Sequence, residues 1–165
     1  MARAIELYLV RHAIAEERGP RWPDDGRRPL TSKGIERFRE VAAGLRAIEA
    51  RIDLVLTSPL VRARQTADLL AAALDPHPPV EVSDALAPGA SPRALAAVLS
   101  RAKRARIACV GHEPDLGQLA AHHVGASRPL ELKKGGICRI DLDAPAGPGR
   151  LVWLASPGLL RHAGG

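Results

Sequence analysis

The stretch LYLVRHAIAEE, residues 7–17, runs an apolar segment straight into an arginine and a histidine. Short apolar runs rich in β-branched residues are typical of buried strands, so Arg11 and His12 are expected where the first strand ends. The same dipeptide recurs at Arg161 and His162 in a glycine-ended tail. The pair alone therefore identifies nothing, and its surroundings in the fold must decide.

Strand-like and helix-like segments alternate outward from this stretch. Strands are predicted at residues 5–10, 53–58, 79–83 and 106–112, helices at 59–74, 91–103 and 113–124, and a further helix where Ile35, Phe38, Ala42, Leu45 and Ile48 recur at helical spacing. Thr31 or Ser32 is placed to cap that further helix. Pro59, after Ser58, is expected near the first position of its helix, and Ser91-Pro92 opens another in the same way.

The tail breaks the alternation. Residues 137–142 and 150–155 flank the turn-rich APAGPG and predict an antiparallel hairpin at a sheet edge. The chain has 165 residues, 46% of them hydrophobic, which is enough for one buried core. We therefore expect a single domain over residues 1–165, built as a three-layer α/β/α sandwich with a mostly parallel central sheet.

The charge of the chain leaves several kinds of partner open. Its 24 Lys and Arg against 18 Asp and Glu give +6, compatible with a polyanion, an acidic membrane surface or a small phosphorylated substrate. Twenty of the basic residues are arginine, a bias that genomic base composition alone can produce. One Phe, one Tyr and two Trp leave little to stack on bases, and the basic residues are scattered, so we expect no nucleic-acid partner.

Neither a metal, a cofactor nor a membrane is indicated. Cys109 and Cys138 lie in apolar, β-like runs without the Cys or His spacing of a metal site, and we expect them to be reduced core residues. The N-terminal apolar run is interrupted by Glu6 and ended by Arg11 and His12, which fits neither a signal peptide nor a membrane span. We expect a cytoplasmic protein.

Polar residues gather at the predicted carboxyl ends of three strands. Arg11 and His12 end the first strand, Thr57 and Ser58 the second, and His112 follows Gly at the end of the fourth. Ligands of such sheets bind beyond the carboxyl ends of the strands. We therefore expect these side chains to meet at one edge of the sheet.

Two histidines and two arginines in this region have the chemistry of phosphoryl transfer, although either histidine alone would more often be structural. Arg62 lies in the first turn of a predicted helix, where free N–H groups and the helix dipole already favour an anion. Guanidinium groups match phosphate oxygens in pairs, and imidazole can attack phosphorus. We expect His12 to attack in line while Arg11, Arg62 and the second histidine stabilise charge on the phosphoryl oxygens. Neighbouring positive charge should lower the pKa of His12 from about 6.5 and keep it unprotonated at neutral pH.

Four motifs occur in an order that resembles the histidine phosphatase superfamily, which has the phosphoglycerate-mutase-like fold. They are LVRHA, RPLTSKG, SPLVRARQTA and VGHEPDL, and the resemblance covers about residues 7–116. The short chain and the wording of these motifs are most similar to the bacterial SixA-type phosphohistidine phosphatases. The resemblance implies that His12 becomes phosphohistidine, that Arg11 and Arg62 bind phosphate, and that His112 is the second histidine of the phosphate pocket.

A general acid is harder to place. Many larger members of the superfamily carry a Glu or Asp after the third strand that protonates the leaving oxygen, whereas this chain has SDALAPGAS there, with Asp84 nearby. The other candidates are Glu113, Glu16, Glu17, Asp24 and Asp25. Imidazole departs far more readily than an alkoxide, so weak provision of an acid favours an N-phosphorylated substrate or an anhydride over a sugar phosphate.

Residues 16–29 mix glycine, proline and charge and predict a mobile loop directly after His12. The loop is either a solvated connector or a rim that touches a protein substrate, with Trp22 as an apolar contact and Arg27 or Arg28 reaching toward phosphate. The resemblance implies little lid over the pocket, and an exposed pocket suits a phosphorylated side chain on another protein.

These features predict a metal-independent phosphatase that forms a phosphohistidine intermediate and acts on phosphohistidine of a partner protein. One alternative is a phosphatase of small phosphate esters or anhydrides within the same superfamily. An alternative of a different class is a non-catalytic module that only binds phosphorylated ligands.

Overall fold

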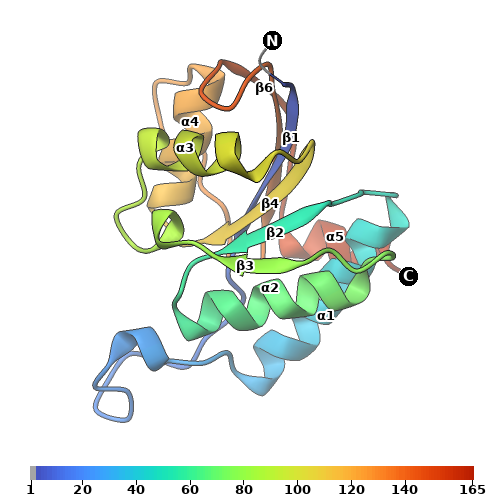
Figure 1. The fold of residues 1–165 in the computed structure, drawn as a ribbon. Coiled ribbons are helices and arrows are strands. Elements are labelled where there is room, and N and C mark those ends of the chain that lie inside the picture. The colour runs from blue at the N-terminus through green and yellow to red at the C-terminus, as the bar shows by residue number, and fades with distance from the viewer. Residues whose placement is uncertain (1–2) are drawn as a thin grey trace.

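Six strands form one sheet at the centre of the protein, in a computed structural model that describes residues 3–165 (Figure 1). In chain order the strands are β1 (Ile5–Arg11), β2 (Leu54–Thr57), β3 (Val80–Val82), β4 (Arg106–Gly111), β5 (Ile137–Leu142) and β6 (Gly149–Ala155). The order across the sheet is β3-β2-β4-β1-β5-β6. The four strands from β3 to β1 run parallel, while β5 pairs antiparallel with both β1 and β6, so the predicted hairpin lies at an edge.

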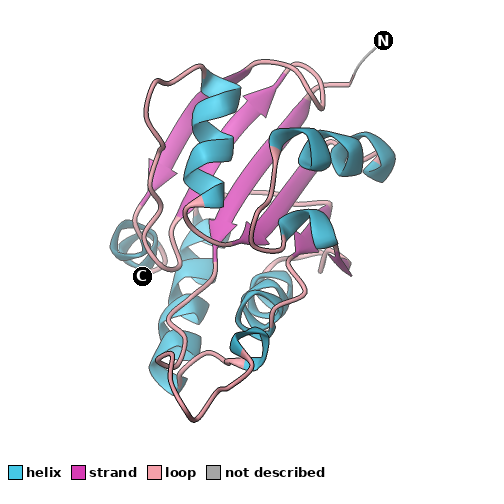
Figure 2. Ribbon diagram, turned by 90° about the vertical axis from the view of Figure 1, so that its left-hand side faces the viewer, coloured by secondary structure: helices cyan, strands magenta, loops and turns pink. Residues whose placement is uncertain are grey.

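Helices cover both faces of the sheet, which confirms the predicted three-layer α/β/α sandwich (Figures 1 and 2). One face carries α1 (Ser32–Ala47), α2 (Val61–Ala73) and α5 (Pro157–Ala163), and the other carries α3 (Pro92–Ala102) and α4 (Asp115–Val124). Tyr8 and Val10 of β1 enter the first core, and Leu7 and Leu9 enter the second. Both faces of β1 are buried, and this is why the strand reads as a continuous apolar run.

Two helices begin at the capping residues that the sequence offers. The Oγ1 of Thr31 accepts a hydrogen bond from the backbone N–H of Gly34 at 2.9 Å and so caps α1. Ser91 caps α3, and Pro92 occupies the first helical position, where its missing N–H costs nothing. Both starts agree with the prediction.

The start of α2 differs from the prediction, because Pro59 is not its first residue. The Oγ of Ser58 accepts a hydrogen bond from the backbone N–H of Leu60 at 3.2 Å, which ties these residues into a turn. The helix therefore begins only at Val61, two positions after the proline. The turn keeps Ser58 at the end of β2 rather than in the helix.

Two other helical features also depart from the sequence pattern. Ile48 was expected on the apolar stripe of α1, but it is the C-terminal cap of that helix and its side chain is 45% exposed, since it lies beyond the last turn. Helix α5 occupies the tail, where no helix was predicted. Ser156 caps it and Pro157 is its first residue, the same Ser-Pro signal that marks α3.

The two cysteines lie in the core, as expected. Cys109 and Cys138 are buried and unpaired in the core, where burial raises the pKa of each thiol to about 12. Along residues 3–165, every helix is too short or too polar to cross a membrane.

A close approach of α1 to α5 gives a test of the packing. A Cβ added to Gly44 of α1 would lie 1.7 Å from the backbone oxygen of Leu160 in α5, so Gly44→Ala must push the two helices apart. We expect a loss of about 1–3 kcal/mol or more in the free energy of unfolding, measured by urea denaturation. Gly158→Ala, also on α5, is the control, since its added Cβ would meet no atom nearer than 3.9 Å. Equal stability of the two variants would contradict this packing.

Candidate active site

The carboxyl ends of β1, β2 and β4 bring the predicted polar residues to one edge of the sheet. The backbone N–H of His12 donates to the oxygen of Gly111 at 3.1 Å, which continues the β1–β4 pairing by one residue. The rings of His12 and His112 then lie with their centroids 5.2 Å apart. With Arg11 and Arg62 they line one cavity of about 520 Å³. The structure thus brings together all four residues predicted to carry the chemistry.

A backbone contact fixes the tautomer of His12. Its Nδ1 lies 2.8 Å from the oxygen of Ala13, and because a carbonyl oxygen can only accept, Nδ1 must carry the hydrogen. The lone pair is therefore on Nε2. The peptide of Ala13 is itself held, since its N–H donates to Oγ1 of Thr66 at 3.0 Å.

The His12 imidazole is kept neutral. Its pKa is lowered to about 3, mainly by burial. The hydrogen bond to Ala13 opposes this shift, and electrostatic repulsion from His112, Arg62 and Arg11 contributes to it. The positive charge that the sequence suggested acts in the expected direction, but removal from water has the larger effect. Nε2 of His12 is thus an unprotonated nitrogen at neutral pH.

The second histidine is held by β2. Nε2 of His112 lies 2.8 Å from Oγ of Ser58, and its Nδ1 is buried without a hydrogen-bond partner among residues 3–165. Burial, followed by the charge of Arg62, lowers the pKa of His112 to about 4. A neutral imidazole with one ring nitrogen unused can donate to or accept from a ligand in the cavity.

The two arginines are anchored so that part of each guanidinium stays unused. The Nη1 of Arg11 donates to the oxygen of Leu132 at 2.8 Å. Arg62, which is 3% exposed, donates from Nη1 to the oxygen of Asp25 at 2.8 Å and from Nη2 to the Asp25 carboxylate at 3.0 Å. In both arginines Nε is buried and makes no hydrogen bond within the described part of the chain.

Buried polar atoms without partners are concentrated in the residues that line this cavity. In the described chain, four buried side-chain polar atoms lack a partner, and three of them belong to Arg11, Arg62 and His112. A buried donor without an acceptor is costly and points to a bound group. A tetrahedral oxyanion would supply acceptors for them beside the free Nε2 of His12.

The acid candidates separate clearly. Glu113 lines the cavity, and burial raises the pKa of its carboxyl although Oε1 accepts a hydrogen bond from the N–H of Gly117 at 2.9 Å. Asp84 is exposed in the short 3-10 helix Asp84–Leu86 and lies outside the residues that line the cavity. Of the loop acids, Glu16, Glu17 and Asp25 line the cavity.

Asp24 and Asp25 also hold the loop in place through their own contacts. Asp24 caps the 3-10 helix Asp25–Arg27. The carboxylate of Asp25 pairs with both Arg62 and Arg28, and although burial opposes its ionisation, these two partners hold its pKa below the ordinary value.

Residues 16–29 contribute to the wall of the cavity. Arg28 is 8% exposed and lines the cavity, with Nε bound to Asp25 at 2.9 Å and Nη1 to the oxygen of Glu16 at 2.7 Å. Arg27 is exposed and Trp22 is half-buried, and neither is among the described residues that line the cavity. Arg28, not Arg27, is the loop arginine beside the site.

Thr66 and Lys134 are site residues that sequence reasoning missed. Thr66 could have been found, because it lies one helical turn after Arg62, and its Oγ1 donates to the Arg62 oxygen at 2.8 Å while it accepts from Ala13. Lys134 lines the cavity from the loop before β5 and carries no periodic signal.

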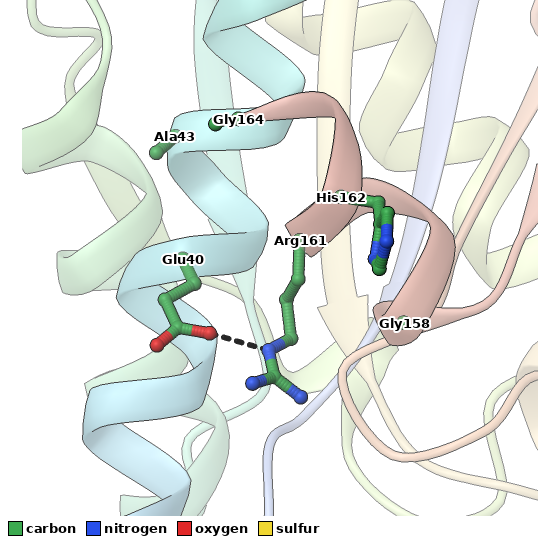
Figure 3. A pocket seen from close by; sticks show the side chains of 7 residues that line it. Glu40, Ala43, Gly158, Arg161, His162 and Gly164 are labelled. Carbon is green, nitrogen blue, oxygen red and sulfur yellow. Dashed lines mark hydrogen bonds and ion pairs between the residues drawn. The ribbon is translucent and has the colours of Figure 1, made fainter.

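A cavity of similar size, about 570 Å³, lies between α1 and α5 and is not a catalytic candidate. Figure 3 shows Arg161 extending from α5 toward Glu40 of α1, with which it forms an ion pair, while the His162 ring lies away from that pair. In the second Arg-His dipeptide, the charge of Arg161 is thus compensated by Glu40 at the surface. Within residues 3–165, no group of three or more His, Cys, Asp or Glu could hold a metal ion.

Comparison with known proteins gives similarities over most of the chain. The sequence profile of the Histidine phosphatase superfamily (branch 1) matches residues 7–87. An uncharacterized protein of Picosynechococcus sp. is 46% identical over 145 residues, covering 81% of this chain and 82% of that protein. The phosphohistidine phosphatase SixA of Escherichia coli is 28% identical over 162 residues, covering 96% and 98%. The solved structure of the protein histidine phosphatase SixA complexed with tungstate is 27% identical, with a TM-score of 0.83 over 94% of this chain and 99% of that one.

The depressed histidine pKa values predict a loss of stability in acid. In the unfolded chain His12 and His112 titrate near 6.5, but in the folded protein only at about 3 and about 4. Protons therefore bind the unfolded chain preferentially, so the stability present above pH 6.5 falls as the pH drops toward 4, by up to about 1.4 kcal/mol per pH unit for each histidine. In urea denaturation at pH 7.5 and 4.5, the double variant His12→Asn/His112→Asn should lose less stability than the wild type. An equal loss in both proteins would show that neither imidazole is held neutral.

Proposed function

The chain belongs to the histidine phosphatase superfamily, as a member of the SixA type, and we propose that this phosphatase removes phosphate from phosphohistidine on a partner protein. The enzyme forms a phosphohistidine intermediate on Nε2 of His12. Its steps require no metal and no cofactor. In this proposal residues 1–165 form one catalytic domain that works in the cytoplasm. The two core cysteines stay reduced there.

The proposal rests on one arrangement: His12, whose Nε2 has the lone pair, lines one cavity with Arg11, Arg62 and His112, and each of these three keeps a buried polar atom without a hydrogen-bond partner in the described chain. Nε2 of His12 is a nucleophile, and the two guanidiniums and the second imidazole can donate hydrogen bonds to phosphoryl oxygens. Phosphoryl transfer needs little more than this, because the protein's task is to position the group and stabilise its oxygens.

The proposed first step moves the phosphoryl group between two imidazoles. Nε2 of His12 attacks phosphorus in line, and the bond from phosphorus to the substrate nitrogen breaks with its electron pair returning to the substrate. When the other ring nitrogen of the substrate carries a hydrogen, the leaving group is a neutral imidazole. The two arginines and His112 bind the phosphoryl oxygens throughout.

The second step is hydrolysis of the phosphoenzyme. Water attacks phosphorus, the bond to Nε2 of His12 breaks, and the lone pair returns to that nitrogen. The product is dihydrogen phosphate, which keeps both protons of the water. Nδ1 of His12 stays bonded to the oxygen of Ala13 in both steps, so the ring orientation is preserved.

Two further observations favour phosphohistidine as the substrate. Asp84, at the position after the third strand, is exposed outside the cavity, so the place where a leaving alkoxide would be protonated is weakly provided, whereas imidazole needs little help to depart. The solved SixA structure with 27% identity is a complex with tungstate. Tungstate is a tetrahedral oxyanion, the shape that the four residues of this cavity could bind.

Glu113 supports the small phosphate ester or anhydride as a second candidate substrate. It lines the cavity, and burial raises the pKa of its carboxyl, which is the direction that favours a general acid. A non-catalytic phospho-ligand module is the remaining alternative. It would bind phosphorylated ligands without forming a phosphoenzyme.

Trapping the intermediate tests the proposal. With free phosphohistidine as donor and a rapid alkaline quench, the wild type should carry phosphate, and His12→Asn should carry none and lose at least about 10³-fold in turnover. His162→Asn removes the exposed histidine of the second Arg-His dipeptide and should behave as the wild type. Phosphoenzyme in the His12→Asn variant would refute the assignment, and its absence in the wild type would favour the binding module.

Replacing Glu113 separates the two substrate classes. If Glu113 protonates the leaving oxygen of an ester, Glu113→Gln should reduce turnover of an alkyl phosphate such as ethyl phosphate by about 10²- to 10⁴-fold. Turnover of phosphohistidine should change less than about threefold, since imidazole leaves unaided. Asp84→Asn, outside the cavity, is the control and should change neither rate. An equal loss for both substrates would contradict the leaving-group argument.

A further inference from the structure

A small hollow adjoins the reaction cavity on the side of α1 and α5. Its lining includes Ala13, which follows the proposed nucleophile, and Phe38 and Pro157. Lys134 lines both this hollow and the reaction cavity, so the two share one residue of their walls. The hollow has a volume of about 50 Å³. A single water molecule needs about 10–15 Å³ of such volume, so the hollow has room for a small apolar side chain.

The rim of this hollow carries positive charge. Three cations line it, Arg37, Lys134 and Arg161, and no carboxylate among the described residues does. Arg161 is neutralised by Glu40 (Figure 3). In the described chain, neither Arg37 nor Lys134 has a carboxylate within ion-pairing distance.

The adjoining helix terminus adds to this charge. The first turn of α1 contains Lys33 and no acidic residue. The dipole of a helix is positive at that end and favours an anion. Positive charge at the turn of Lys134 and at the start of α1 thus favours a negatively charged group at the rim.

The turn that presents Lys134 is fixed to the reaction site. The backbone N–H of Gly135 donates to the oxygens of both Arg11 and His12 at 3.1 Å. The φ of Gly135 is +79°, a conformation that glycine adopts without strain. Gly136 N–H donates back to the Lys133 oxygen at 2.7 Å and closes the turn. The backbone of Lys134 is therefore held in place relative to the nucleophile.

We propose that this hollow and its rim are a docking subsite for the acidic segment that flanks phosphohistidine in the partner protein. A small apolar side chain of that segment enters the hollow beside Phe38, and neighbouring carboxylates pair with Lys134 and Arg37. The inference rests on the proposed function and deepens it, since it names what distinguishes a protein substrate from free phosphohistidine. The uncompensated cations of the rim and the residue that the hollow shares with the reaction cavity favour this occupant.

Three phosphohistidine peptides of equal length test the subsite. The first carries aspartates and a valine next to phosphohistidine, the second has lysines in place of the aspartates, and the third has tryptophan in place of the valine. For each, kcat/KM is divided by the value for free phosphohistidine measured with the same enzyme. In the wild type this ratio should be highest for the first peptide, and tryptophan should lower it because its ring exceeds the hollow.

Charge reversal then assigns the effect to the rim. Arg37→Glu and Lys134→Glu should each lower the ratio for the aspartate peptide by roughly 5- to 20-fold at low salt, and raise it for the lysine peptide. Arg101→Glu makes the same charge change on α3, across the sheet, and should leave the ratios as in the wild type.

Each outcome decides between the two proposals. Equal wild-type ratios for the aspartate and lysine peptides, or equal effects of the Arg101 and Arg37 reversals, would overturn the docking subsite while the phosphatase assignment stands. If neither free phosphohistidine nor any peptide is hydrolysed, the proposed function fails and the subsite fails with it.

Discussion

The parallel pairing of β1 with β4 is the constraint on which the rest of the site depends. Arg11 lies opposite Gly111 in this register, so the residues that follow each strand leave the sheet side by side. A slip by one residue would exchange the side chains between the two cores, sending Leu9 to the face of Val10. Burial on both faces thus holds the register, and the register holds the two imidazoles together. Stability and chemistry are set by the same apolar residues.

Removing the histidines from water resolves an electrostatic difficulty. Four cations clustered at one sheet edge would repel one another and would each lose hydration. Because burial keeps His12 and His112 neutral, only the two guanidiniums remain charged, and Asp25 offsets Arg62 directly. The neutrality that limits repulsion also leaves the lone pair that a nucleophile requires. An incoming phosphate would add negative charge where the protein has a surplus of donors.

The sequence predicted the parts of this molecule that follow periodic rules. Strand ends, Ser-Pro helix starts and the ordered motifs located His12, His112 and the two arginines, because parallel strands share one carboxyl edge. The pairing of Arg62 with Asp25 depends on the path of an irregular loop, which has no period to read. Asp84 follows β3 in a 3-10 helix, which has no periodic pattern in the sequence. The sequence therefore did not show that Glu113 lines the cavity and that Asp84 lies outside it. Local hydrogen bonding, as at Ser58, likewise displaced a helix start that proline alone suggested.

The place of β1 in the sheet has a consequence for how the chain reaches its folded state. Strand β1 is an inner strand, and its two neighbours, β4 and β5, begin only at residues 106 and 137. Until then both edges of β1 lack their partner strands, and unpaired strand edges are prone to aggregation. The long sequence separation of these pairings also slows folding, since loops must close before contacts form. Residues up to the end of β5 must therefore be synthesised before the reaction centre can assemble, and a ribosome-bound chain should gain catalytic competence only after that point.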